Sequence, residues 1–303
     1  MWEWILLACS VMCMCINNVG SKTNKAKGGG RFLNVTITSF IAAVILWIIV
    51  AVVDEKVSMN MLIYALIFAV FGVFGKCMGY LAYEKGSMLA TTLFSNSSLI
   101  VVVVFGVFFF QEPFELLTGI GIIGVIASLV LFALAGDSDK LKEDGIKVAE
   151  KKKHSINFIW LLCCLGIVLA NSAISISTKI RQVNVGGANV FAYMALCYTL
   201  MCIISALVYG FIQIKATSLK ADIVNVKACV PSLLMQSFGN AGCNVLVTIL
   251  AARMLGAVLY PVNTGGGLVL TVLCGFLFFK EKKTWKNILG IALGIVSIVI
   301  LSL

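Results

Sequence analysis

The chain has 303 residues, of which 61% are apolar, 12% are charged and 3 are prolines, and its formal net charge is +10. A soluble domain carries about 25% charged residues and about 45–50% apolar ones. The apolar excess is too large for one core and too evenly spread for a single anchor. This composition excludes most soluble enzyme folds, secreted disulfide scaffolds and disordered proteins. It predicts a multi-pass protein of the cell membrane.

Apolar runs along the chain are long enough to be transmembrane helices. A helix needs about 20 apolar residues to cross a bilayer core of about 30 Å. We therefore predict an all-α membrane protein with ten transmembrane helices. The ten segments are residues 2–18, 33–53, 59–83, 88–110, 115–135, 156–176, 189–213, 228–250, 254–279 and 284–303.

One long connection divides the chain into two similar halves. Residues 136–155 are rich in charge, and we interpret them as a solvated linker between five spans in 1–135 and five in 156–303. An internal repeat supports this division. The sequence FGVFG at Phe71–Gly75 matches FGNAG at Phe238–Gly242. A second match joins the ends of spans four and nine, at Phe108–Glu112 and Leu277–Glu281.

The number of spans in each half determines how the halves are related. Because five is odd, the second half must cross the membrane in the opposite direction to the first. We therefore predict two inverted five-helix repeats. Transporters built in this way bind their substrate near the membrane midplane, at the interface between the repeats.

The positive charge follows membrane topology. Eighteen Lys and Arg residues fall in or at the edge of the connections after spans one, three, five, seven and nine, with Lys286 counted at the start of the last span, and four fall in the other connections. By the positive-inside rule the first set faces the cytoplasm, and both termini then face outside. We expect the lipid bilayer and a small-molecule substrate as partners, and no nucleic acid.

The cysteines and histidine give no metal-binding pattern. Eleven cysteines lie mostly inside apolar segments, no two of them form a CxxC pair, and the chain has one histidine. Metal-ligand spacing is therefore absent. We interpret the cysteines as small apolar packing residues, and we expect neither a metal nor a cofactor.

Each half has an apolar helix that ends in a glutamate, followed by a glycine-bearing final helix. This pattern resembles the drug/metabolite transporter superfamily, EamA type. The resemblance implies a ten-helix carrier for small metabolites, with spans 1–4 and 6–9 around a central cavity and spans 5 and 10 peripheral. It also implies termini in the cytoplasm, against the charge distribution. The residues that carry it are Gly106 to Glu112, Gly121, Gly124, Gly275 to Glu281, Gly290, Gly294, Asn17, Asn18 and the basic run Lys22 to Arg31.

Lys76 is the charged side chain that the sequence places most clearly inside a span. A lysine at the centre of a membrane helix costs about 2.5–3.5 kcal/mol. Gly72, Tyr80 and Tyr83 share its helix face, which favours a wet cavity where Lys76 attracts an anionic group such as a carboxylate or phosphate. The alternative is a structural lysine bonded to helix-end carbonyls or to a neighbouring asparagine.

Gln236, Asn240 and Asn244 form an amide stripe on one face of the eighth span, because they are spaced by four residues. Amides are costly in hydrocarbon, so this face should meet protein, water or substrate. Its alternative role is interhelical hydrogen bonding. The repeat makes spans three and eight counterparts and sets Lys76 opposite Cys243. We therefore predict that Lys76 and the stripe face one cavity.

Small and polar runs mark three further places. Asn171 begins a weaker polar stripe on the sixth span. Asn96, in Ser95–Ser98, and Asn263, in Asn263–Gly267, occupy corresponding places in spans four and nine. Such runs either break a helix at midspan near a substrate or allow close helix packing. The pairs Gly75-x-x-x-Gly79 and Gly290-x-x-x-Gly294 predict close packing.

These features favour a carrier that moves a small polar or anionic metabolite by alternating access at a cavity between the repeats. No acidic residue lies in the middle of a span, which favours exchange or facilitated diffusion over proton coupling and disfavours a cation-exporting multidrug pump. Flipping of a lipid or lipid-linked sugar and multidrug export remain the alternatives. An enzyme is not expected, because the spans hold no HExxH motif and no pair of aspartates.

Overall fold

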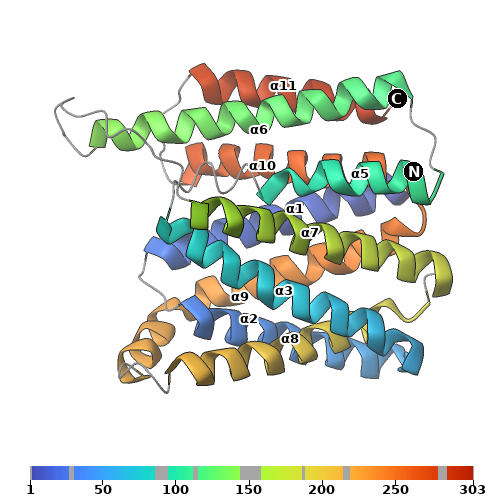
Figure 1. Cartoon of the computed structure of the whole chain (residues 1–303), viewed down its shortest axis with the longest axis vertical. Helices are drawn as coiled ribbons and strands as arrows, with labels where there is room; N and C mark the ends of the chain where they lie inside the picture. Colours follow the sequence, from blue (N-terminus) through green and yellow to red (C-terminus); the bar gives the residue numbers. More distant parts are fainter. Residues whose placement is uncertain are drawn as a thin grey trace. The chain divides into compact units, whose positions relative to one another are not determined.

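The computed structural model describes residues 2–26, 31–85, 95–111, 115–143, 158–185, 188–213, 219–278 and 285–302. In these residues every regular element is a helix, and there are ten of them; Figure 1 shows their arrangement along the chain. This confirms the predicted ten-helix, all-α fold. The helices are α1 (Trp2–Ala26), α2 (Arg31–Val53), α3 (Met59–Lys85), α5 (Ser98–Phe109), α6 (Leu116–Glu143), α7 (Phe158–Val185), α8 (Val190–Gln213), α9 (Leu219–Ala251), α10 (Gly256–Phe278) and α11 (Trp285–Ser302).

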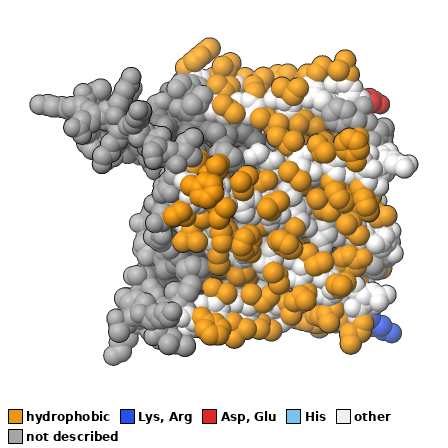
Figure 2. Space-filling model, viewed as in Figure 1, with side chains coloured by type: hydrophobic (Ala, Val, Ile, Leu, Met, Phe, Trp, Pro, Cys, Tyr) orange, Lys and Arg blue, Asp and Glu red, His pale blue; other side chains and the backbone are white. Residues whose placement is uncertain are grey.

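The helices have the length and the surface of membrane spans. Seven described helices contain a stretch long and apolar enough to cross a bilayer, and three shorter apolar helices accompany them. Large apolar side chains also point outward, as at Phe40, Ile48 and Leu207. Hydrophobic side chains are spread over the face that Figure 2 shows. Soluble proteins rarely expose apolar surface on this scale, so the chain is a multi-pass membrane protein.

The chain forms two compact units, and each combines segments from both sequence halves. Unit 1 holds residues 1–76 and 173–254, and unit 2 holds residues 77–172 and 255–303. Helices α3 and α7 therefore contribute residues to both units. These units are a division by packing, distinct from the sequence division into 1–135 and 156–303.

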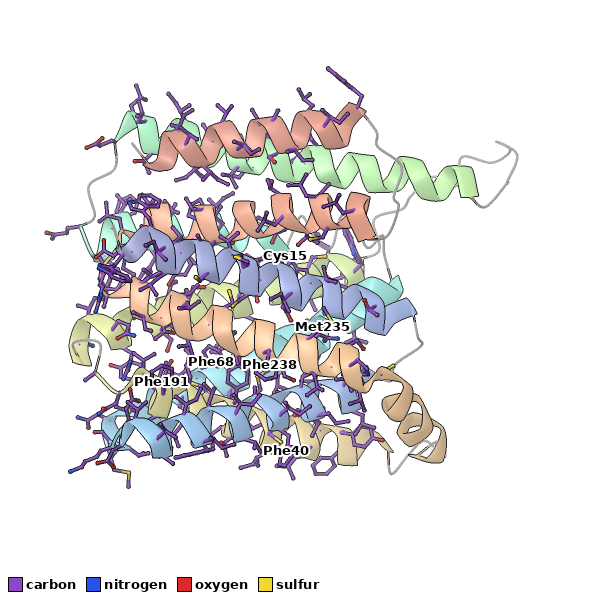
Figure 3. All side chains as sticks on the ribbon, turned by 180° about the vertical axis from the view of Figure 1, so that it is seen from behind. Cys15, Phe40, Phe68, Phe191, Met235 and Phe238 are labelled. Carbon is purple, nitrogen blue, oxygen red and sulfur yellow. The ribbon has the colours of Figure 1, made fainter. Side chains whose placement is uncertain are left out.

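In unit 1, α1 packs against α9, and α2 packs against α8 (Figure 1). Cys15 on α1 and Met235 on α9 mark the first pair in Figure 3. The two backbones nearly touch at Gly239, where an added Cβ would lie 2.5 Å from the Asn17 nitrogen. The glycine of the second FGxxG segment thus allows α1 to approach α9.

In unit 2, α6 packs against α11 through small residues. A Cβ at Gly124 would lie against the Ser297 hydroxyl, and the Ser128 hydroxyl donates to the Gly290 carbonyl at 2.7 Å. A Cβ at Gly294 would lie 2.8 Å from Val269, so close packing at Gly290-x-x-x-Gly294 is confirmed. At Gly79 nothing lies within 4 Å of an added Cβ, and the packing predicted there is wrong.

Four helices extend eight or nine residues beyond the predicted spans: α1 at its end, α9 at its start, and α6 and α7 at their ends. Helix α7 continues to Val185, so Lys179 and Arg181, which the sequence places in a connection, lie inside it and are buried. The helix continues because Arg181 finds partners in the protein interior, as described below. Helix α6 continues to Glu143 through the first part of the predicted linker. The rest of that linker lies outside the described residues.

Candidate functional site

A buried arginine organises one end of unit 1. Arg181, near the end of α7, is fully buried, and its guanidinium lies 4.6 Å from the centre of the Tyr193 ring on α8. It donates to the carbonyls of Ala188 and Asn189 and, at 3.2 Å, to the side-chain oxygen of Gln182. Arginine suits this place because its planar group offers several fixed donors and stacks on aromatic rings.

A glutamate from the first half of the chain reaches the same end of unit 1. After α2, Asp54 adopts a positive φ of 57°, and the Glu55 N–H donates to the Val50 carbonyl at 3.3 Å. This helix-ending turn directs the Glu55 carboxylate to the Ala192 N–H in the first turn of α8, at 2.8 Å. A carboxylate is favoured there because helix N-termini carry partial positive charge.

Hydrogen bonds lead from this arginine to the amide stripe. The Gln182 amide nitrogen donates to the Thr248 carbonyl at 2.6 Å, and the Thr248 hydroxyl donates to the Asn244 carbonyl at 2.7 Å. Thr248 lies in the last turn of α9, and Gln182 lies next to the residue that contacts the start of α8. Helices α8 and α9 therefore run antiparallel.

The amide stripe lies between α1 and α8. Gln236 donates to the Gly20 carbonyl of α1 at 3.2 Å, and Asn244 donates to the Tyr198 hydroxyl of α8 at 2.8 Å. Asn240 accepts from Asn244 through its main-chain and side-chain oxygens. All three amides are partly accessible. Gln236 and Asn244 make the interhelical bonds expected under the alternative role, and the stripe remains open to a further partner.

Helical spacing places the stripe away from the apolar surface of α9. Leu234 and Phe238 are exposed, and at about 100° per residue they lie roughly opposite Gln236 on the helix. Phe238 is labelled in Figure 3. The amides therefore point to the interior of unit 1, and the opposite face of α9 carries the apolar residues suited to lipid.

Lys76 lies on the face of α3 that packs against α8. The rings of Phe68 and Tyr198 are 6.3 Å apart, and a Cβ at Gly72 would lie 3.4 Å from Met201. The later residue of α3, Gly72, contacts the later residue of α8, Met201, so α3 and α8 run parallel. Lys76 follows one turn after Gly72. It is partly accessible, and the structure gives it no hydrogen bond or ion pair to a described residue.

These contacts set the depth of Lys76 relative to the stripe. Phe68, Tyr198 and Asn244 lie at one level, and Lys76 lies about 12 Å further along α3, level with Gln236. The predicted register, with Lys76 opposite Cys243, therefore shifts by two helical turns. A helical side chain leans toward the N-terminus, which brings the Lys76 ammonium back toward the level of Gly72 and Asn240.

The other predicted residues lie in unit 2. Asn171 donates to the Ser95 hydroxyl at 3.1 Å, which ties α7 to the segment before α5. Asn96 is partly accessible, whereas Asn263 is buried. Tyr80 and Tyr83 belong to α3, and their side chains lie outside the described residues. The structure thus assigns Lys76, Gln236, Asn240 and Asn244 to unit 1 and the other five predicted residues to unit 2.

Only the first of the two small-residue runs interrupts a helix. A turn at Ser97 precedes α5, which begins at Ser98. Helix α10 runs without a break from Gly256 to Phe278, through Asn263–Gly267 and Pro261. A Cβ at Gly265 would lie 3.0 Å from Val125 of α6. The run in α10 therefore serves close packing.

Three residues of unit 1 that the sequence did not single out belong to this polar region: Arg181, Gln182 and Tyr198. Arg181 and Gln182 lie in a stretch that resembles a connection between spans, because Lys179 and Arg181 are charged. Tyr198 stands in the middle of an apolar run and looks like a packing residue. The sequence does contain one signal for Gln182 and Arg181. At helical spacing they continue the polar face of α7 that is formed by Asn171, Ser175 and Thr178.

Comparisons with known proteins concern the family and the fold of the chain. Residues 1–134 match the EamA-like transporter family. No curated protein matches the chain. The alignment with one solved crystal structure covers 98% of this chain and 95% of the chain in that structure, with a TM-score of 0.71 and 12% sequence identity. The two proteins therefore share a fold over the whole length. The match to the EamA-like transporter family thus covers residues 1–134, and over the remaining residues the similarity to known proteins is one of fold.

Proposed function

We propose that the chain moves a small polar or anionic metabolite across the cell membrane by alternating access, at a cavity between the two repeats. The cavity would lie within unit 1, between α3 of the first repeat and α8 and α9 of the second. The observation that carries the proposal is the polar face in this apolar bundle. Lys76 brings a charge without a described partner, and Gln236, Asn240 and Asn244 are partly accessible in the same unit.

The residues have different roles in this proposal. The Lys76 ammonium attracts a carboxylate or phosphate, which offsets the cost of its charge inside the membrane. The amides bind polar groups of the same molecule. Arg181 and Gln182 support the site, because they fix the end of α9 that carries Asn244.

Helix pairing supports the inverted repeat behind this mechanism. The pairs α2 with α8, α5 with α10 and α6 with α11 each join predicted counterparts. In the predicted repeat α1 corresponds to α7, and α9 corresponds to α3. The packing of α1 against α9 should therefore have an equivalent in the packing of α7 against α3. Those two helices do pack together, through Ala82 and Met78 of α3 and Cys163, Cys164 and Ile167 of α7.

The charges support exchange or facilitated diffusion. Among the described residues, the buried charged side chains are Lys179 and Arg181, and both are basic. Proton-coupled carriers commonly move the proton on a carboxylate or histidine inside the membrane. The described part of the chain offers no buried carboxylate for that role.

Ligand-induced stabilisation tests the proposal. Purified protein would be screened by thermal unfolding against carboxylates, phosphate monoesters, polyols and lipids, because a ligand of the folded state raises its apparent stability. We expect anions to stabilise the wild type. In Lys76→Met the affinity for them should fall about 10- to 100-fold, since a charged hydrogen bond contributes about 1.5–3 kcal/mol.

Lys56→Met is the matched control, because Lys56 is exposed in the connection between α2 and α3. It removes the same charge and should bind anions as the wild type does. Equal anion binding by Lys76→Met and Lys56→Met would contradict the proposed role of Lys76. Stabilisation by lipids alone would favour a flippase.

A further inference from the structure

The hydrogen bonds of the amide stripe fix which way each amide points. The Asn244 nitrogen lies 3.0 Å from the Asn240 carbonyl. A main-chain carbonyl only accepts, so nitrogen rather than oxygen must face it. The same nitrogen lies 3.2 Å from the side-chain oxygen of Asn240. Reversing the Asn240 amide would place two donors against each other, so its oxygen faces Asn244 and its nitrogen faces away.

The same argument orients Gln236. Its nitrogen lies 3.2 Å from the Gly20 carbonyl, which can only accept. The Gln236 side-chain oxygen is therefore the group left for another partner. Asn244 uses its nitrogen on Tyr198 and Asn240, which leaves its oxygen. The structure gives neither oxygen a partner among the described residues.

The stripe therefore presents a fixed order of hydrogen-bonding groups: acceptor at Gln236, donor at Asn240 and acceptor at Asn244. Neighbouring positions are about 6 Å apart along the helix. The ammonium of Lys76 leans toward the level of Asn240, so the two donors lie at one depth. The central position suits an anion, and the flanking positions suit hydrogen-bond donors.

We infer that the substrate is an anion that also carries a hydroxyl or other donor group about 6 Å from its charge. Asn240 is then a residue that determines specificity, because it donates to the anionic group beside Lys76. This inference rests on the proposed function and narrows its substrate class. An anion without the donor would leave the oxygens of both Gln236 and Asn244 unpaired in the bound state, whereas the donor would pair one of them; a polar group that the substrate closes off from water without a partner is unfavourable.

Two probes of equal chain length test the inference: butyrate, and 4-hydroxybutyrate, which adds a hydroxyl at the far end. Binding to the purified full-length protein would be measured by calorimetry. We expect 4-hydroxybutyrate to bind the wild type about 3- to 10-fold more tightly, the ratio for one neutral hydrogen bond. Asn240→Asp has the same shape but replaces the donor with a negative charge. It should weaken binding of both probes at least about tenfold.

Asn184→Asp is the control, because it adds the same charge at an exposed residue of α7. Its partner, the Tyr64 hydroxyl, can reverse its role and donate to the new carboxylate. Three results would overturn the inference: equal affinity of the wild type for the two probes, no binding of either, or Asn240→Asp binding them as Asn184→Asp does. The Lys76→Met screen with phosphates and polyols judges the proposed function separately.

Discussion

Gly239→Ala tests whether the backbones of α1 and α9 are in contact. The added Cβ would lie 2.5 Å from the Asn17 nitrogen, 2.6 Å from the Cys13 oxygen and 2.9 Å from the Asn17 Cα. All three are backbone atoms, so no side-chain rotation relieves the clash. The two helices must separate by about 1 Å to restore ordinary contact distances.

The expected loss of stability follows from two opposing terms. Overpacking a core costs about 1–3 kcal/mol, and a rigid backbone obstacle belongs at the upper end of that range. Alanine is favoured over glycine inside a helix by about 0.8–1 kcal/mol. The net destabilisation is about 2 kcal/mol. In a large domain each kcal/mol lowers the unfolding midpoint by about 2–4 °C, so we expect a decrease of about 4–8 °C.

Thermal unfolding of detergent-purified protein, followed by tryptophan fluorescence, measures this change. Gly210→Ala is the control, because Gly210 also lies in unit 1 and an added Cβ there meets nothing within 4 Å. That variant should unfold at or slightly above the wild-type temperature. If Gly239→Ala is as stable as Gly210→Ala, the close approach of α1 to α9 is wrong.

Three further predictions concern the arginine, the small-residue packing and the orientation. Arg181→Met should lower stability by about 3 kcal/mol, with Arg181→Lys intermediate, because carbonyls and the Gln182 amide lose a charged donor; a wild-type unfolding temperature for Arg181→Met would contradict this role. Ser128→Ala should lose about 1 kcal/mol with its bond to Gly290, and an unchanged midpoint would exclude that contribution. A C-terminal reporter that is active only in the cytoplasm should stay silent, since the basic connections predict termini outside; activity would instead support the orientation that the family resemblance implies.

Sequence patterns predict the helices well because burial in lipid requires long apolar runs. Their ends are less predictable, as α7 illustrates. Lys179 and Arg181 look like residues of a connection, yet both are buried inside the helix. What buries Arg181 is the Tyr193 ring and two carbonyls that come later in the chain. Such tertiary partners leave no local signal.

The candidate site is also predictable only in part, because local spacing indicates which residues share a helix face but not their tertiary partners. Four-residue spacing groups Gln236, Asn240 and Asn244 on one face, and a lone lysine in a span draws attention to Lys76. Spacing does not reveal that Gln236 binds α1 while Asn244 binds α8. It also does not distinguish Gly239, which touches a backbone, from Gly79, which faces open space.

The central claim is that Lys76 and the amide stripe form the transport site and work without a proton gradient. The most direct test is uptake of the tightest-binding anion into proteoliposomes loaded with the same anion, at equal pH on both sides. The account predicts exchange by the wild type and by Lys56→Met, and none by Lys76→Met. Exchange by Lys76→Met at the wild-type rate, or wild-type exchange that requires a pH difference, would contradict it.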